Sequence, residues 1–99
     1  MLTIQYIIPA DYDRQKTLLV AGVLIKSLVE IIKDVNKNKE YSPSDFVFYP
    51  LNTFQIAKTK KMLISGRGLG LKILNKIDTK FLDTLKRINL KVNRMEFKK

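Results

Sequence analysis

The sequence predicts a single α+β domain spanning residues 1–99, in which one long and one short helix pack on a mostly antiparallel sheet. Three observations predict this fold class. Apolar residues alternate at the amino terminus as in a strand, and a long segment after Pro9 has the period of a helix. Short apolar runs separated by turn-forming residues fill most of the remaining chain, together with one further helical pattern.

Residues 2–8 should form the first strand and residues 12–36 the long helix. In the strand, polar Thr3 and Gln5 separate the apolar residues Leu2, Ile4, Tyr6 and Ile8. Pro9 ends the strand, and Asp11 or Asp13 offers a side-chain oxygen to the first amide groups of the helix. The expected core stripe of this helix consists of Leu18, Ala21, Ile25, Leu28, Ile32 and Val35, widened by Val20, Leu24, Val29 and Ile31.

Two aliphatic residues, Leu19 and Val23, fall on the opposite, charged side of the long helix. Either a loop of the same chain covers them, or a second copy of the protein does. In the second case, Leu19 and Val23 mark the interface of a homodimer. Both alternatives stay open at the level of the sequence.

The middle of the chain is expected to be rich in strand. Residues 46–49 combine aromatic and β-branched side chains as in a buried strand, and Pro50 then favours a turn. Phe54 and Ile56 are expected to begin a returning strand. A helix over residues 52–64 is the alternative, but its apolar residues scatter around the helix and form no stripe.

The segment MLISGRGLGLK, residues 62–72, raises the question of a phosphate-binding loop. Its spacing argues against one, because Leu71 stands where the dinucleotide-binding fingerprint requires its last glycine, and Lys72 is followed by Ile73 where a P-loop requires Ser or Thr. A hairpin with a three-residue loop is the better interpretation, with Gly68 in the left-handed conformation and LGLKIL, residues 69–74, as the second strand. Arg67 then projects from the tip of that hairpin.

The end of the chain predicts a short helix and a last strand. Asp78 is expected to cap the helix, whose apolar face consists of Phe81, Leu82, Leu85 and Ile88. Residues 90–97 are expected to form the strand. An irregularity is expected near Asn93, because the apolar residues before and after it have opposite parity.

Composition excludes many chemistries. The chain contains no Cys and no His, which removes thiolate nucleophiles, disulfides, metal sites built on sulfur or imidazole, and the usual general base near neutral pH. No pair of acids has a spacing typical of catalysis. We therefore expect a protein that is not an enzyme and that uses no cofactor, metal or small-molecule ligand.

The sequence also predicts that the protein stays inside the cell that makes it. Its longest apolar run, residues 18–25, is under half the length that a bilayer crossing requires. The amino terminus has neither the basic opening nor the long apolar centre of a secretory signal.

The net charge of +10 is confined to the second half of the chain. Residues 1–50 carry six basic and six acidic side chains, whereas residues 51–99 carry 13 basic and three acidic ones. This asymmetry indicates a polyanionic partner, of which double-stranded DNA is the simplest. A solvated lysine surface that binds nothing is the alternative. The residues expected to contact phosphates are Lys58, Lys60, Lys61, Arg67, Lys72 and Lys76.

Three features of the chain support a resemblance: the opening MLTIQYIIPADYD, the helix KTLLVAGVLIKSLVEIIKDVNKNK and the lysine-rich second half. Together they resemble the small, basic, cysteine-free proteins of archaeal linear double-stranded DNA viruses, the lipothrixviruses and rudiviruses. The resemblance implies a thermostable protein of the host cytoplasm. It rests on no motif and assigns no functional residue.

Overall fold

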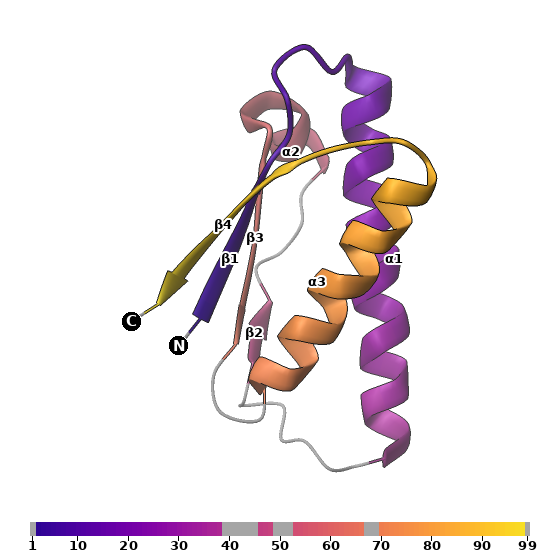
Figure 1. The fold of residues 1–99 in the computed structure, drawn as a ribbon, viewed down its shortest axis with the longest axis vertical. Helices are drawn as coiled ribbons and strands as arrows, with labels where there is room; N and C mark the ends of the chain where they lie inside the picture. Colours follow the sequence, from indigo (N-terminus) through magenta and orange to yellow (C-terminus); the bar gives the residue numbers. More distant parts are fainter. Residues whose placement is uncertain (1, 39–45, 49–52, 67–69, 99) are drawn as a thin grey trace.

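A computed structural model describes residues 2–38, 46–48, 53–66 and 70–98 of the chain. Four strands and three helices follow one another along the sequence (Figure 1). In chain order they are β1 (Leu2–Ile7), α1 (Arg14–Asn38), β2 (Phe46–Phe48), α2 (Thr53–Thr59), β3 (Lys61–Gly66), α3 (Gly70–Arg87) and β4 (Asn93–Lys98).

The four strands form one sheet in the order β2-β3-β1-β4, and every neighbouring pair is antiparallel. The units β1-α1-β2 and β3-α3-β4 are therefore both split βαβ units, each with a strand of the other unit between its own two strands. This is the ferredoxin-like arrangement, with α2 added between β2 and β3. Helices α1 and α3 lie side by side on one face of the sheet (Figure 1). The predicted α+β class is confirmed.

The core lies between the sheet and these two helices. The alternation predicted for β1 is confirmed, because Ile4, Tyr6 and Ile8 are buried there while Thr3 and Gln5 point to the other face. From β3, Met62 and Ile64 join the core. Helices α1 and α3 each contribute five residues to the core, and those of α3 are Ile73, Leu74, Ile77, Phe81 and Leu85.

The start of α1 was predicted well, and its buried face was predicted in part. The Asp13 side chain accepts a hydrogen bond from the Lys16 amide at 2.7 Å, as a helix cap does. The buried face is rotated from the predicted stripe, so that Leu18, Ile25 and Ile32 are only half-buried. The buried apolar residues Val20, Ala21, Leu24, Leu28 and Ile31 all belong to the predicted face, whereas Val29, also predicted there, is 45% exposed. Thr17 and Ser27 are buried as well, although they were not predicted to be.

Two hydroxyl residues explain that rotation. Thr17 and Ser27 lie in the buried face, and each donates its hydroxyl to the carbonyl one turn earlier, at 2.8 and 2.9 Å. A hydroxyl satisfied in this way is buried at little cost. The apolar pattern counts such residues as polar and therefore misplaces the centre of the stripe.

The predicted strand at Phe54 and Ile56 is wrong, because these residues lie in α2. The helix alternative over residues 52–64 is right only for its first half. Lys60 alone separates α2 from β3, in the left-handed conformation with φ of 60°, and its amide closes α2 by bonding to the Ile56 carbonyl at 2.8 Å. The sequence gives no signal for this sharp turn, since Lys rarely adopts positive φ.

The predicted hairpin after residue 66 is also wrong. The strand β3 ends at Gly66 as expected, but Gly70 begins a helix, and β3 pairs with β1 and β2 instead of the next segment. Arg67 and Gly68 lie outside the described residues. At Gly66 a side-chain Cβ would approach the Gly70 carbonyl oxygen to 3.0 Å, so this glycine allows β3 and α3 to come close together.

The end of α3 has a well-defined stop. Asn89 adopts the left-handed conformation with φ of 63°, and the amides of Asn89 and Leu90 bond to the carbonyls of Lys86 and Leu85 at 3.2 and 2.9 Å. This is the Schellman pattern of helix ends. The irregularity predicted near Asn93 corresponds to the beginning of β4, so Leu90 and Val92 belong to the connection.

Candidate nucleic-acid interface

The exposed face of α3 carries five of the 13 basic side chains that the sequence places in its second half. Seven residues of the helix are buried against the sheet and α1. On the other sides of α3 there is one exposed acid, Asp83, and there are five cations. These cations are Lys72, Lys76, Lys80, Lys86 and Arg87.

Three of these lysines form a row along the helix. Lys72, Lys76 and Lys80 are four residues apart, so they are neighbours on the helix surface and span about 12 Å. Like charges at this spacing destabilise a helix by about 0.2–0.5 kcal/mol per pair. The row therefore opposes the stability of α3, and the folding of the helix does not explain it.

One lysine of the row is paired. The Lys80 ammonium forms an ion pair with the Glu30 carboxylate of α1. The hydrogen bond from Lys80 lowers the pKa of Glu30 below its ordinary value. Within the described residues no ion pair involves Lys72, Lys76 or Arg87, so their charges are available to an external anion.

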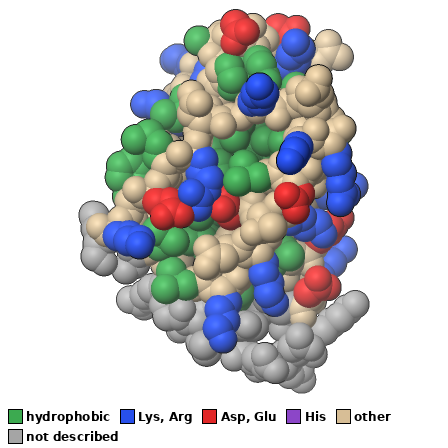
Figure 2. Space-filling model, in the orientation of Figure 1, with side chains coloured by type: hydrophobic (Ala, Val, Ile, Leu, Met, Phe, Trp, Pro, Cys, Tyr) green, Lys and Arg blue, Asp and Glu red, His purple; other side chains and the backbone are tan. Residues whose placement is uncertain are grey.

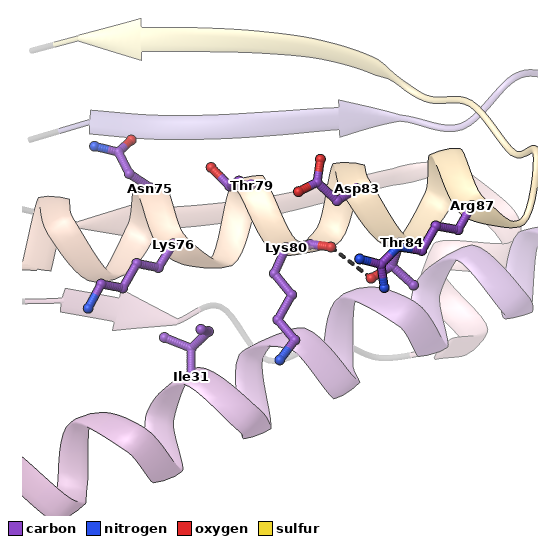
Figure 3. Close-up of a pocket in the computed structure, with 8 residues that line it drawn as sticks. All are labelled: Ile31, Asn75, Lys76, Thr79, Lys80, Asp83, Thr84 and Arg87. Carbon is purple, nitrogen blue, oxygen red and sulfur yellow. Dashed lines mark hydrogen bonds between the residues drawn. The ribbon is translucent and has the colours of Figure 1, made fainter.

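A groove of about 610 Å³ runs along α3 beside α1. Figure 3 shows Lys76 and Lys80 extending from α3 toward α1, with Arg87 further along the same helix. The Thr84 hydroxyl is already used, since it donates to the Lys80 carbonyl at 2.8 Å. The other lining residues are Ile31, Asn75, Thr79 and Asp83, so the groove offers side-chain donors suited to phosphate together with one acid.

The structure separates the six residues expected to contact phosphates. Lys72 and Lys76 lie together on α3. Lys58 is exposed on α2. Lys61 is exposed at the start of β3, about 17 Å along the strand from Gly66, which lies close to Gly70, the first residue of α3. Arg67 lies outside the described residues.

Lys60, the remaining member of that set, has an internal role. Its ammonium donates to the Tyr12 carbonyl and, at 2.7 Å, to the Thr17 hydroxyl. It thus ties the turn between α2 and β3 to the start of α1. Its charge is engaged in the fold.

Three further members of this surface, Lys80, Lys86 and Arg87, are not among the residues predicted from the sequence. The signal was present in the spacing of Lys72, Lys76 and Lys80, which is helical. The expected strand over residues 69–74 hides this signal, because residues four apart in a strand lie about 13 Å apart and do not form a close row.

The two residues of the predicted oligomer contact differ in how exposed they are in the structure. Leu19 is 52% exposed, whereas Val23 is half-buried and packs against the core. Both line a second groove of about 670 Å³ between α1 and α3, together with Ile88, which is 42% exposed. Leu19 and Ile88 are therefore the exposed apolar residues of this groove.

A largely buried polar cluster joins α3 to the sheet. Asp78, predicted as a helix cap, lies instead in the middle of α3 with its carboxylate directed into the core. It accepts a hydrogen bond from the Tyr6 hydroxyl at 2.6 Å and two from Arg94 Nε at 3.0 and 2.9 Å. The Tyr6 ring also packs edge-on against Phe81, at 4.7 Å between centroids.

This cluster has the character of a structural anchor. Burial, reinforced by the hydrogen bond to Asp78, raises the pKa of Tyr6 above its ordinary value, so its hydroxyl remains a donor. The Asp78 carboxylate likewise raises the pKa of Arg94. Among the described residues, every buried side-chain nitrogen and oxygen has a partner. The buried polar atoms of this anchor thus satisfy one another.

Two further kinds of site were sought in the part of the chain that the structure describes. No group of three or more His, Cys, Asp or Glu side chains there is arranged to hold a metal ion. No described helix has the length and apolar character needed to cross a membrane.

Comparison of the chain with protein-family models, curated proteins and solved structures finds no match. The fold and the surface of α3 therefore define the class by themselves: a small α+β protein with ferredoxin-like strand order and a basic helix face.

Proposed function

We propose that this protein is a non-enzymatic binding module that contacts a polyanion, most simply double-stranded DNA, through the exposed face of α3. The observation that carries the proposal is the concentration of five cations and one acid on that face. The like-charged row costs the helix stability, and an anionic partner would reverse that cost. The resemblance to proteins of double-stranded DNA viruses favours duplex DNA among the polyanions.

The expected mode of binding is contact with phosphates. Base stacking requires exposed aromatic side chains beside the cations. On α3 the only aromatic residue, Phe81, is fully buried, and Phe97 lies on the opposite face of the sheet. Binding should therefore be independent of sequence and should weaken steeply with salt, because each neutralised phosphate releases counterions.

The proposal is tested by fluorescence anisotropy with a labelled duplex of about 30 base pairs at about 50 and 200 mM salt. The variant Lys72→Ala/Lys76→Ala removes two cations from α3. The matched control Lys58→Ala/Lys61→Ala removes two exposed lysines elsewhere, so both variants have the same net charge. We expect the α3 variant to lose about tenfold or more in affinity at the lower salt concentration and the control to lose less than about threefold.

Two results would contradict the proposal. Equal losses in the two variants would mean that net charge alone attracts the duplex. Affinity that does not change between the two salt concentrations would exclude phosphate contact.

Self-association through α1 is a second candidate, favoured by one observation. Leu19 and Ile88 are both exposed and both line the 670 Å³ groove between α1 and α3. A surface of this kind accepts an apolar side chain of another molecule. Sedimentation of Leu19→Glu tests this candidate. If α1 is the interface, the variant should remain monomeric under conditions where the unmodified protein associates.

A further inference from the structure

The strand β4 forms an open edge of the sheet. Among the described residues it pairs only with β1, and all six of its residues keep an unbroken register with that strand (Figure 1). Its outer edge therefore presents a row of peptide N–H and C=O groups. The strand contains neither proline nor a bulge, two devices that usually protect such an edge.

Two of the most exposed apolar side chains belong to this strand. Met95 is 45% exposed and Phe97 is 44% exposed. They lie opposite Gln5 and Thr3 of β1, on the face of the sheet that α1 and α3 do not cover. Ser65, on the same face of β3, is fully buried. On this face of the sheet, the exposed apolar side chains Met95 and Phe97 thus lie at the β4 edge.

The charges of β4 complement one another in one particular self-pairing. If the strand pairs antiparallel with a second copy of itself about Met95, Arg94 lies opposite Glu96 of the partner subunit. Residues directly opposite in an antiparallel pair have Cβ atoms about 4.5–5.5 Å apart and point to the same face. Arg94 and Glu96 already form an ion pair within the strand, so the four side chains would alternate in sign.

The neighbouring registers lack this complementarity. A shift centred on Glu96 places two glutamates opposite each other, and it also brings Arg94 opposite Lys98 of the partner subunit. A shift centred on Arg94 places two arginines together. Like charges directly opposite each other destabilise a strand pair. The sequence of the edge therefore specifies its own register.

We propose that β4 is a self-recognition strand, through which a second copy of this chain binds antiparallel about Met95 and joins the two four-stranded sheets into one. The pairing is isologous, as a twofold dimer requires. It supplies main-chain hydrogen bonds to the open edge, Met95 contacts Met95 of the partner subunit, and Phe97 lies opposite Asn93 of the partner subunit.

The twofold pairing of β4 would place the exposed α3 faces of both copies on the same side of the joined sheet. A twofold axis that relates two edge strands in a continuous sheet is perpendicular to that sheet. The helices of both copies then lie on the same side, and so do both basic faces. The inference does not depend on the proposed function, because β4 and the exposed face of α3 share no residue.

The dimer should be weak. A single six-residue strand pair buries less than the 1,200–2,000 Å² of a stable interface, and two chains of net charge +10 repel each other. We expect association in the range of about 10 μM to 1 mM. It should persist at about 0.5 M salt, because salt weakens charge repulsion between the copies, whereas binding to a duplex should be lost there.

Disulfide trapping tests the register, since the natural chain contains no cysteine. In Met95→Cys, the two Cα atoms face each other at about 4.5–5.5 Å, within the range of a disulfide. In Phe97→Cys, the two positions are four residues out of register, about 13 Å apart. Under mild oxidation we expect Met95→Cys to form the cross-linked dimer about tenfold faster than Phe97→Cys or Leu19→Cys.

The outcomes separate the alternatives. Equal rates for Met95→Cys and Phe97→Cys would overturn the proposed register, and faster cross-linking of Leu19→Cys would assign the contact to α1. For the unmodified protein, a monomeric mass in sedimentation up to about 1 mM would overturn the proposal altogether. In the same assay, Glu96→Lys should weaken association about tenfold, because it places Lys opposite Arg94 of the partner subunit. Circular dichroism checks that each variant is folded.

Discussion

Tyr6 and Asp78 show how a single buried contact can join a helix to a sheet. The Tyr6 hydroxyl donates to the Asp78 carboxylate at 2.6 Å, and Arg94 from the edge strand binds the same carboxylate. A buried carboxylate is tolerated only when it is paired and hydrogen-bonded in this way. From the sequence, Asp78 was interpreted as a helix cap, because Asp is common at caps and because its partners are 72 and 16 residues away.

The Tyr6 hydroxyl is the first residue-scale prediction. Because burial raises its pKa above its ordinary value, folding disfavours ionisation of this group, and its contribution to stability is present below pH 10 and lost as the pH rises further. In an absorbance titration at alkaline pH, one tyrosine should ionise only when the protein unfolds. Tyr6→Phe should remove that late step and lower the free energy of unfolding by about 2 kcal/mol. Ionisation of all tyrosines near pH 10 in the folded protein would contradict this prediction.

Two glycines give a matched pair of residue-scale substitutions. A Cβ added at Gly22, inside α1, meets no described atom within 4 Å, whereas one added at Gly66 approaches the Gly70 carbonyl oxygen to 3.0 Å. Gly22→Ala should therefore raise the free energy of unfolding by about 1 kcal/mol, as expected for alanine in a helix. Gly66→Ala should lower it. Urea denaturation measures both, and a loss of stability in Gly22→Ala would mean that another surface approaches α1 there.

At the scale of elements, α1 and α3 differ in how well their sequences describe them. Asp13 marks the start of α1 correctly, and only the two buried hydroxyl residues misplace its core face. The first two turns of α3 were interpreted as a strand, since a short apolar run such as LGLKIL fits both structures. In the structure the apolar residues of this run belong to the buried stripe of α3 that ends at Leu85, and burial of this long stripe favours the helix.

The lysine row of α3 yields an element-scale prediction in which stability and binding change in opposite directions. Lys76 has a like-charged neighbour on each side along the helix, Lys72 and Lys80. Lys76→Glu converts these two like-charged pairs into two oppositely charged pairs. It should stabilise the protein by about 0.5–1 kcal/mol in thermal or urea unfolding at low salt. The same change should weaken binding to a duplex by about tenfold or more. A control, Lys58→Glu on α2, should change neither quantity by as much, and weaker stability in Lys76→Glu would contradict the argument.

At the scale of the whole molecule, the sheet order β2-β3-β1-β4 decides which surfaces exist. It leaves β4 at an edge with Met95 and Phe97 exposed, and it buries Asp78 against β1 and β4. The lysines expected to act together are divided between α3 and the far end of β3. The proposed binding face and the proposed self-recognition strand are thus both products of this order.

The sequence by itself determined the α+β class, the first strand, the start of the long helix and the half of the chain that carries the excess charge. These features depend on local periodicity, capping and composition, all of which a linear pattern contains. The tertiary structure alone decided which lysines share a surface, where Asp78 lies and which strand is left at an edge. Those outcomes depend on contacts between residues far apart in the chain, and no local preference encodes which distant partners will meet.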